Sequence, residues 1–166
     1  MRFATASLAA LAVVVAACGT PGGLPESPPC PTPDPALVPG SAVGVSEFAT
    51  AVDRALAQFQ QIDQEFRGEW PGRRFRDRDS FKRDFVQFAG ASRCLVDDLR
   101  AAGVPPEMEQ VAAELLVFLG QVESSLAEAE EAVATRNASA YDDWVGSFDR
   151  LVLGYTEFQD RVRPFR

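Results

Sequence analysis

The sequence predicts an all-α fold, an antiparallel four-helix bundle, and three observations support this prediction. From Val45 onward, apolar residues recur at alternating spacings of three and four, which is the period of a helix that buries one face. Breaks that contain glycine, proline or asparagine divide this region into four segments. No segment shows the strict alternation of a half-buried strand. With 166 residues, 46% of them apolar, the chain is long enough to bury one core.

The first two helices are separated by the longest connection, which runs from Arg67 to Asp79. Ser46 is expected to cap the first helix, and the second is expected to begin at Asp79-Ser80 and to stop at Gly103. The apolar positions predict which face of each helix is buried. These stripes are Phe48, Val52, Ala55, Phe59, Ile62 and Phe66 in the first helix, and Phe81, Phe85, Phe88, Ser92, Leu95, Leu99 and Ala102 in the second.

The third helix is expected to open at Pro105-Pro106, because proline is tolerated in a first turn, and to end at Asn137. Ser139 and Asp142 have the spacing of a capping box for the fourth helix. The short connections after the second and third helices require antiparallel neighbours. The stripes are Met108, Val111, Leu115, Phe118 or Leu119, Val122, Leu126, Ala129 and Val133, and then Tyr141, Trp144, Phe148, Leu151 or Val152, Tyr155, Phe158 and Val162.

The N-terminus has the composition of an export signal. Residues 3–17 form an uncharged run behind Arg2, and this run is shorter than the roughly 20 residues of a transmembrane helix. A positive start, a short apolar region and small residues before a break describe a secretory signal peptide. One interpretation of this run is an ordinary secretory signal that happens to precede a cysteine.

Val15-Ala16-Ala17-Cys18 resembles the lipobox of bacterial lipoproteins. The resemblance implies that residues 1–17 are a signal peptide and that Cys18 becomes the acylated first residue. The protein would then be lipid-anchored at the extracytoplasmic face of a cell membrane. The second half, with its Gly-x-Pro-Pro loop, long acidic helix and final aromatic helix, is similar in architecture to small helical lipoproteins of unknown function.

Residues 18–44 are rich in proline and glycine, which predicts a tether between the anchor and a bundle formed by residues 45–166. A proline-rich recognition motif is the alternative. If Cys18 is acylated, Cys30 and Cys94 remain, and an even number in an oxidising compartment predicts a disulfide. Small residues near Cys94, including Gly90, leave room for an extended segment across the second helix. Two free thiols are the alternative.

The composition argues against several classes of function. The chain has no histidine, which removes the usual acid–base group and the commonest metal ligand. Its net charge of −8 argues against nucleic acid as a partner. The acidic third helix is interpreted as a solvated face, so no metal or other cofactor and no catalytic residue are predicted. The sequence therefore indicates a protein that is not an enzyme.

The stretch from Arg67 to Arg83, which covers the longest connection and the start of the second helix, contains seven of the 16 basic residues of the chain and is the predicted partner surface. Arginine and tryptophan are typical anchors of an interface, and clustered arginine attracts phosphate. An envelope protein, anionic lipid or an acidic wall polymer would suit it. Alternatively, the loop rests against an acidic helix end, with Trp70 plugging the bundle. The residues are Arg67, Trp70, Arg73, Arg74, Phe75, Arg76, Arg78, Lys82 and Arg83.

The function expected from these features is that of a non-catalytic binding or interaction module at the cell envelope. The alternative is a carrier that holds a small apolar ligand or a lipid between the helices. The aromatic stripes are interpreted first as core, which favours the binding module.

Overall fold

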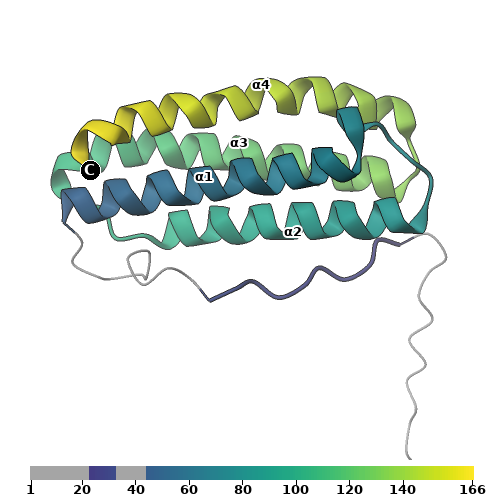
Figure 1. Ribbon diagram of the computed structural model, residues 1–166, viewed down its shortest axis with the longest axis horizontal. Coiled ribbons are helices and arrows are strands. Elements are labelled where there is room, and N and C mark those ends of the chain that lie inside the picture. The colour runs from purple at the N-terminus through teal and green to yellow at the C-terminus, as the bar shows by residue number, and fades with distance from the viewer. Residues whose placement is uncertain (1–22, 33–43) are drawn as a thin grey trace, which may run out of the picture.

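The computed structural model describes residues 23–32 and 44–166, and it shows the expected all-α bundle (Figure 1). The predicted signal peptide, the lipobox with Cys18 and residues 33–43 of the predicted tether lie outside the described residues. The four helices are α1 (Val45–Glu69), α2 (Asp79–Ala101), α3 (Glu109–Ala134) and α4 (Ala138–Val162). Single 3-10 turns occur at Pro71–Arg73, Pro106–Met108 and Arg163–Phe165.

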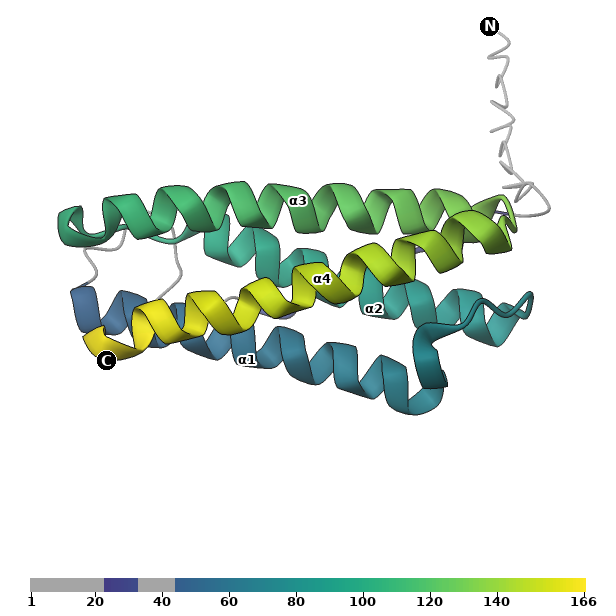
Figure 2. The same ribbon diagram turned by 90° about the horizontal axis from the view of Figure 1, so that it is seen from above.

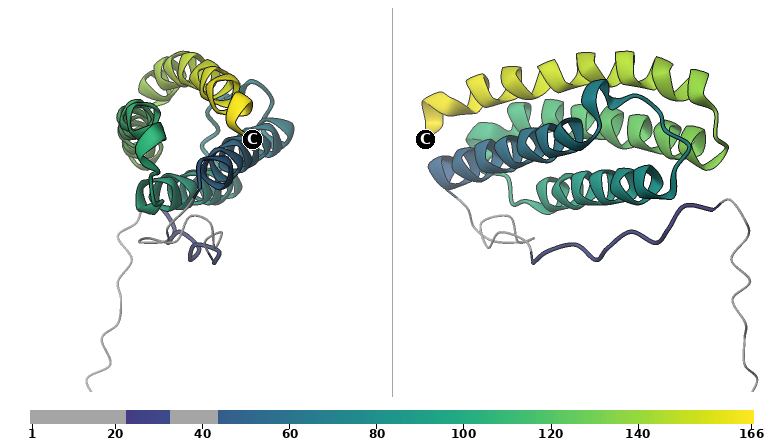
Figure 3. Two further views of the ribbon diagram at one scale, coloured as in Figure 1. Left: turned by 90° about the vertical axis from the view of Figure 1, so that its left-hand side faces the viewer. Right: turned by 45° about the vertical axis from the view of Figure 1, so that its right-hand side comes forward.

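Consecutive helices run in opposite directions and enclose a common core (Figures 1 and 2). Helix α1 packs against α2 and α4, and α3 packs against the same two helices, so each helix has two neighbours (Figure 3, left). One end of the bundle, here called the loop end, carries the α1–α2 connection (70–78) and the α3–α4 turn (135–137). The opposite end carries the α2–α3 connection, the start of α1 and the C-terminus.

Aromatic rings fill the core, as the stripes predicted. Phe81 is fully buried and lies 5.5 Å from Tyr141 and 6.3 Å from Phe85, measured between ring centroids. Farther along the bundle, Phe59 stacks on Tyr155 at 4.0 Å. Burying one such side chain contributes about 1.5–3 kcal/mol, so this core explains why the helices associate. Ile62, Ala102, Val111, Leu151, Val152 and Phe158 are only partly buried at its edge.

The helix ends differ from the expected ones. Helix α1 begins at Val45 behind Gly44, whose backbone N–H donates a 3.1 Å hydrogen bond to the Glu47 carboxylate, so the prediction that Ser46 is the cap is wrong. The predicted Ser139–Asp142 capping box is also wrong. Asn137 caps α4, and its side-chain oxygen accepts a 3.1 Å hydrogen bond from the backbone N–H of Ala140. Asn137 therefore starts α4, whereas α3 already ends at Ala134.

Residues 23–32, here called the strap, lie along the outside of α2 (Figure 1 and Figure 3, right). Cys30 forms the expected disulfide with Cys94 of α2. Ser27 lies so close to Gly90 that a methyl group on this glycine would overlap the serine hydroxyl. Leu24 packs against the core from outside. The strap is therefore a packed part of the domain, as the predicted disulfide and the small residues near Cys94 indicated, although the composition of this region predicts a tether.

Candidate interaction surface

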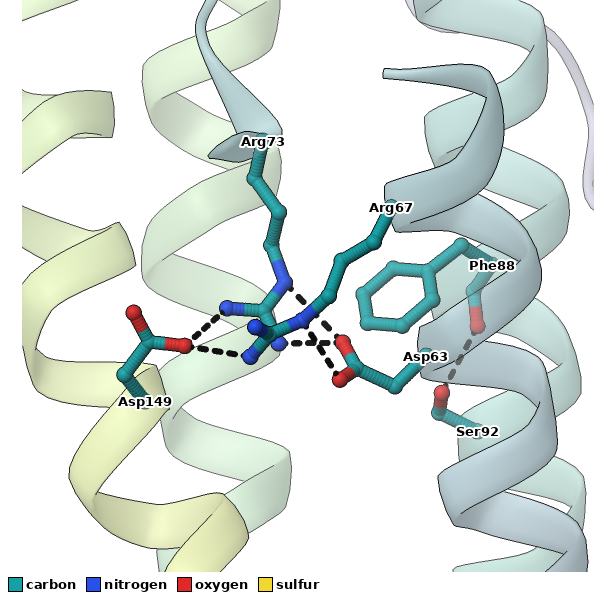
Figure 4. Close-up of polar contacts among 6 residues, drawn as sticks. All are labelled: Asp63, Arg67, Arg73, Phe88, Ser92 and Asp149. Atoms are coloured by element: carbon teal, nitrogen blue, oxygen red, sulfur yellow. Dashed lines mark hydrogen bonds and ion pairs between the residues drawn. The ribbon is translucent and has the colours of Figure 1, made fainter. Parts of the chain in front are cut away.

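The α1–α2 connection begins with a tight turn that points one arginine into the bundle. Gly72 and Arg73 have φ angles of 69° and 48°, both in the left-handed region. Glycine adopts this conformation freely, whereas it is uncommon for arginine. The turn brings the side chain of Arg73 between α1 and α4, where only 1% of the residue is exposed (Figure 4).

Two arginines and two aspartates form a network where the turn meets the helices (Figure 4). The Nε of Arg73 donates a 2.9 Å hydrogen bond to Oδ1 of Asp63, and the Nε of Arg67 donates one of the same length to Oδ2. Both guanidinium groups also pair with Asp149 of α4. Asp63 is 3% exposed, so its charge is tolerable in the interior because it is paired. The network thus ties the connection to both α1 and α4.

The next part of the connection is held by aromatic and polar contacts. Trp70 and Phe75 meet the ring of Phe81 edge-on, with centroid distances of 5.1 and 5.6 Å. The indole N–H of Trp70 donates a 3.2 Å hydrogen bond to Asp84. The side chain of Lys82 is only 6% exposed, and its Nζ lies 3.9 Å from Asp77. These residues stabilise the loop and cover the end of the core.

Three arginines remain outside this framework and are here called the arginine cluster: Arg74, Arg76 and Arg78. All three are exposed. Arg76 donates a 3.1 Å hydrogen bond to the carbonyl oxygen of Phe75, and within the described residues no member of the cluster contacts a carboxylate. Most other arginines are paired with one: Arg67, Arg73, Arg83, Arg93, Arg100, Arg136, Arg161, Arg163 and Arg166.

The structure therefore divides the predicted surface. The prediction is wrong for Arg73 and Lys82, because both side chains are buried in contacts within the chain. Internal contacts are also made by Arg67, Trp70 and Phe75. For Trp70, this agrees with the alternative that it closes the end of the bundle. Exposed basic side chains remain on the arginine cluster, on Arg83, which lies 3.3 Å from Asp84, and on Arg67, whose side chain is 43% exposed although it is paired with Asp63.

Two aspartates that pair with Arg67 and Arg73, Asp63 and Asp149, were not predicted from the sequence. Asp63 lies four positions after Phe59, beside the apolar stripe of the first helix. A charged residue at such a position is rarely buried unless it is paired, so it could have indicated a buried ion pair. Asp149 gave no signal, because it follows Phe148 on a face that the stripe leaves exposed. Its side chain is 48% exposed and still reaches both arginines.

The exposed groups of the site are guanidinium groups. Guanidinium groups bind phosphate and carboxylate groups through paired hydrogen bonds, and they stay protonated, so they do not act as acid–base catalysts. A groove between α1 and α2, about 530 Å³ in volume, is lined by apolar residues and by the charged residues Glu65, Glu69, Arg83 and Asp84, so acidic groups outnumber basic ones there. The described residues contain no group of three His, Cys, Asp or Glu side chains suited to a metal ion.

Two buried hydroxyls are unusual features of the interior. Tyr141 and Tyr155 have no hydrogen-bond partner for their hydroxyl groups among the described residues. Burial raises the pKa of both phenols well above the ordinary value, since a phenolate would be poorly solvated there. Both tyrosines therefore stay neutral and serve as core side chains.

Within residues 23–32 and 44–166, no helix is both long and apolar enough to cross a membrane. No protein-family model matches the chain, and no curated protein or solved structure is significantly similar to it. The candidate site therefore rests on the residues and contacts of this chain alone.

Proposed function

We propose that the protein is a lipid-anchored binding module at the extracytoplasmic face of a cell membrane, without a catalytic role. The arginine cluster is its contact surface for an anionic partner. The observation that carries this proposal is the state of Arg74, Arg76 and Arg78, which are exposed and free of carboxylate contacts among the described residues. Most other arginines of the chain are already paired.

The cluster is also held in place before a partner binds. The buried Arg73–Asp63 pair and the packing of Phe75 on Phe81 fix the backbone on either side of Arg74. A loop that is already ordered loses less conformational entropy on binding, which favours affinity. The arrangement supports recognition of phosphate or carboxylate groups that are presented on a surface.

Two features support the proposed location. The tetrapeptide that ends at Cys18 resembles a lipobox, and such a cysteine carries acyl chains. The Cys30–Cys94 disulfide fits an oxidising compartment outside the cytoplasm. The alternative function, a carrier of an apolar ligand, has less support because aromatic rings in mutual contact, such as Phe59 and Tyr155, occupy the bundle interior.

The anchor is tested on protein purified from bacterial membranes. Mass spectrometry of the N-terminal peptide is expected to show a chain that begins at Cys18 and carries acyl groups. Metabolic labelling with palmitate is expected to be lost in Cys18→Ser. An unmodified Cys18 thiol in the membrane-derived protein would contradict the proposed anchor.

The contact surface is tested by retention on a phosphate-bearing cation exchanger. A protein of net charge −8 is retained there only through a local basic surface. The variant Arg74→Gln/Arg76→Gln/Arg78→Gln is expected to elute earlier in a salt gradient. The matched control, Arg150→Gln/Arg161→Gln/Arg163→Gln, removes the same charge from other exposed positions and is expected to elute with the wild type. Identical elution of the two variants would contradict the assignment.

A further inference from the structure

The strap runs parallel to α2, so the chain before it leads toward the loop end. Ser27 lies beside Gly90 and Cys30 is bonded to Cys94, whereas Pro31 and Thr32 lie beside Leu95 and Asp98. Going back along the chain from Ser27 therefore means moving toward the start of α2. The ribbon shows the beginning of the strap near the loop end of the bundle (Figure 1 and Figure 3, right).

The distances along the chain place the predicted anchor near the arginine cluster. Extended chain covers at most about 3.6 Å per residue, so Gly23 lies up to about 14 Å from Ser27 in the direction of the loop end. Seven residues of α2, from Gly90 back to Arg83, cover about 10 Å. This maximum length is enough for Gly23 to reach the level of Arg83. Cys18 precedes Gly23 by five residues, which is at most about 18 Å of chain.

This placement reverses the orientation that a simple tether implies. Helix α1 begins at the opposite end of the bundle, so a free tether from Cys18 to Val45 would put that end nearest the anchor. The strap and its disulfide instead hold residues 23–32 along α2, with the beginning of the strap at the loop end. The opposite end is about 35 Å from the start of α2, because this helix has 23 residues.

We propose that the arginine cluster docks on the anionic headgroups of the bilayer that holds the acyl chains of Cys18. The bundle then stands with its loop end toward the membrane and with Val104 facing away. This proposal rests on the lipid anchor proposed above and names the anionic partner. An anionic leaflet attracts arginine within about one Debye length, roughly 8–10 Å, and the short chain before Gly23 keeps the cluster within reach.

The charges around the cluster are mixed, so some neighbouring residues oppose docking on an anionic surface. Asp77, between Arg76 and Arg78 in the chain, is paired with Arg136 and lies 3.9 Å from Lys82, so these two cations offset its charge. Asp79 is exposed in the first turn of α2, and Asp142 and Asp143 are exposed one turn into α4. An anionic surface repels all three carboxylates. Docking requires that the attraction of the three arginines outweighs this repulsion.

The test uses the full acylated chain reconstituted into vesicles of phosphatidylcholine alone or mixed with phosphatidylglycerol. A photo-crosslinking amino acid replaces either Glu69, exposed at the end of α1 at the loop end, or Val104, exposed at the opposite end. Lipid adducts are then counted by mass spectrometry. On anionic vesicles, adducts from position 69 are expected to exceed those from position 104 roughly tenfold, and to decrease at high salt.

Two further variants separate charge from proximity. Arg74→Gln/Arg76→Gln/Arg78→Gln is expected to lower the adducts from position 69 roughly tenfold, while Arg150→Gln/Arg161→Gln/Arg163→Gln leaves them unchanged. Cys30→Ala/Cys94→Ala, with its helix content checked by circular dichroism, releases the strap and is expected to lower the same adducts. Together these variants distinguish the cluster from the strap as the cause of the orientation.

The outcomes that overturn the proposal are distinct. Adducts from position 69 that are equal on neutral and anionic vesicles, or unaffected by loss of the cluster, overturn electrostatic docking. Adducts mainly from position 104 overturn the orientation. Competition by soluble poly(glycerol phosphate), without any effect of vesicle charge, assigns the cluster to a wall polymer instead. An unacylated Cys18 overturns the anchor as well, whereas an acylated chain that labels from position 104 overturns only the docking.

Discussion

Asp63 and Arg73 are ten positions apart in the chain and meet inside the bundle, where the Nε of Arg73 donates a 2.9 Å hydrogen bond to Oδ1 of Asp63. Arg73 also lies over the ring of Phe148, 5.1 Å from its centroid. The pair joins the start of the α1–α2 connection to the core. It therefore positions the arginine cluster, which follows it directly in the chain.

Removing one partner of this pair is expected to destabilise the protein strongly. Arg73→Ala leaves the buried carboxylate of Asp63 with Arg67 as its remaining partner, and breaking a buried pair costs about 3–5 kcal/mol. Arg163→Ala is the control, because the Arg163–Asp160 pair is exposed and such pairs contribute about 0–1 kcal/mol. The free energy of unfolding is measured with urea and circular dichroism. Equal losses in the two variants would contradict the structural role of the network.

Replacing both charges should be less harmful than replacing one. Asp63→Leu/Arg73→Met removes the buried charges together and fills similar volume, so its loss of stability is expected to be smaller than that of either single variant. A double variant whose loss equals the sum of the two single losses would show that the residues do not interact.

Gly90 and Gly146 should respond in opposite ways to the same substitution. Gly146→Ala is expected to raise stability by about 0.5–1 kcal/mol, because a methyl group there meets nothing within 4 Å and alanine favours helix. Gly90→Ala is expected to bring no gain, since its methyl group would collide with Ser27. Thermal unfolding of the two variants makes the comparison. A gain at Gly90 as large as at Gly146 would argue against strap contact.

The Cys30–Cys94 bond is expected to contribute about 4 kcal/mol on the chain-entropy view, because it joins positions that are 64 residues apart. Unfolding of the full chain with and without reductant measures this contribution. Alkylation of the unreduced, unfolded protein checks the bond itself. Modification of both Cys30 and Cys94 in that experiment would show that the disulfide does not form.

The two tyrosines of the chain predict how stability changes at high pH. Burial raises the pKa of Tyr141 and Tyr155, so ionisation favours the unfolded state. The free energy of unfolding is therefore unaffected by these tyrosines below pH 10, which is about the pKa of tyrosine in the unfolded chain. Above this pH it decreases by at most about 1.4 kcal/mol per pH unit for each tyrosine. Ultraviolet absorbance should show phenolate only as the protein unfolds. Phenolate at pH 10 in the folded protein would contradict their burial.

The hydroxyl of Tyr155 should also be dispensable. It is buried without a hydrogen-bond partner among the described residues, and such a group costs about 1–3 kcal/mol. Tyr155→Phe is therefore expected to keep or raise the free energy of unfolding in urea. A loss of more than about 1 kcal/mol would indicate that the hydroxyl makes a stabilising contact.

The helix ends show where local sequence patterns stop being sufficient. Ser46 and Ser139 are good capping residues, yet the structure uses Gly44 and Asn137, because the packing of the helices determines where each one begins. Capping propensity is a local property, and several residues near a helix start can have it. The choice among neighbours depends on contacts that are distant in the chain, so boundaries are less predictable than the existence of a helix.

The sequence by itself determined that four helices form and which face of each is buried, because helical periodicity is local. It predicted the Cys30–Cys94 disulfide only on the assumption that Cys18 is acylated, and the tertiary structure brings these two cysteines together. Only the tertiary structure decided that Arg73 is buried while Arg74, Arg76 and Arg78 are exposed, because Asp63 and Asp149 come together from different helices. It also decided that the strap begins at the loop end, since that depends on how residues 23–32 lie along α2.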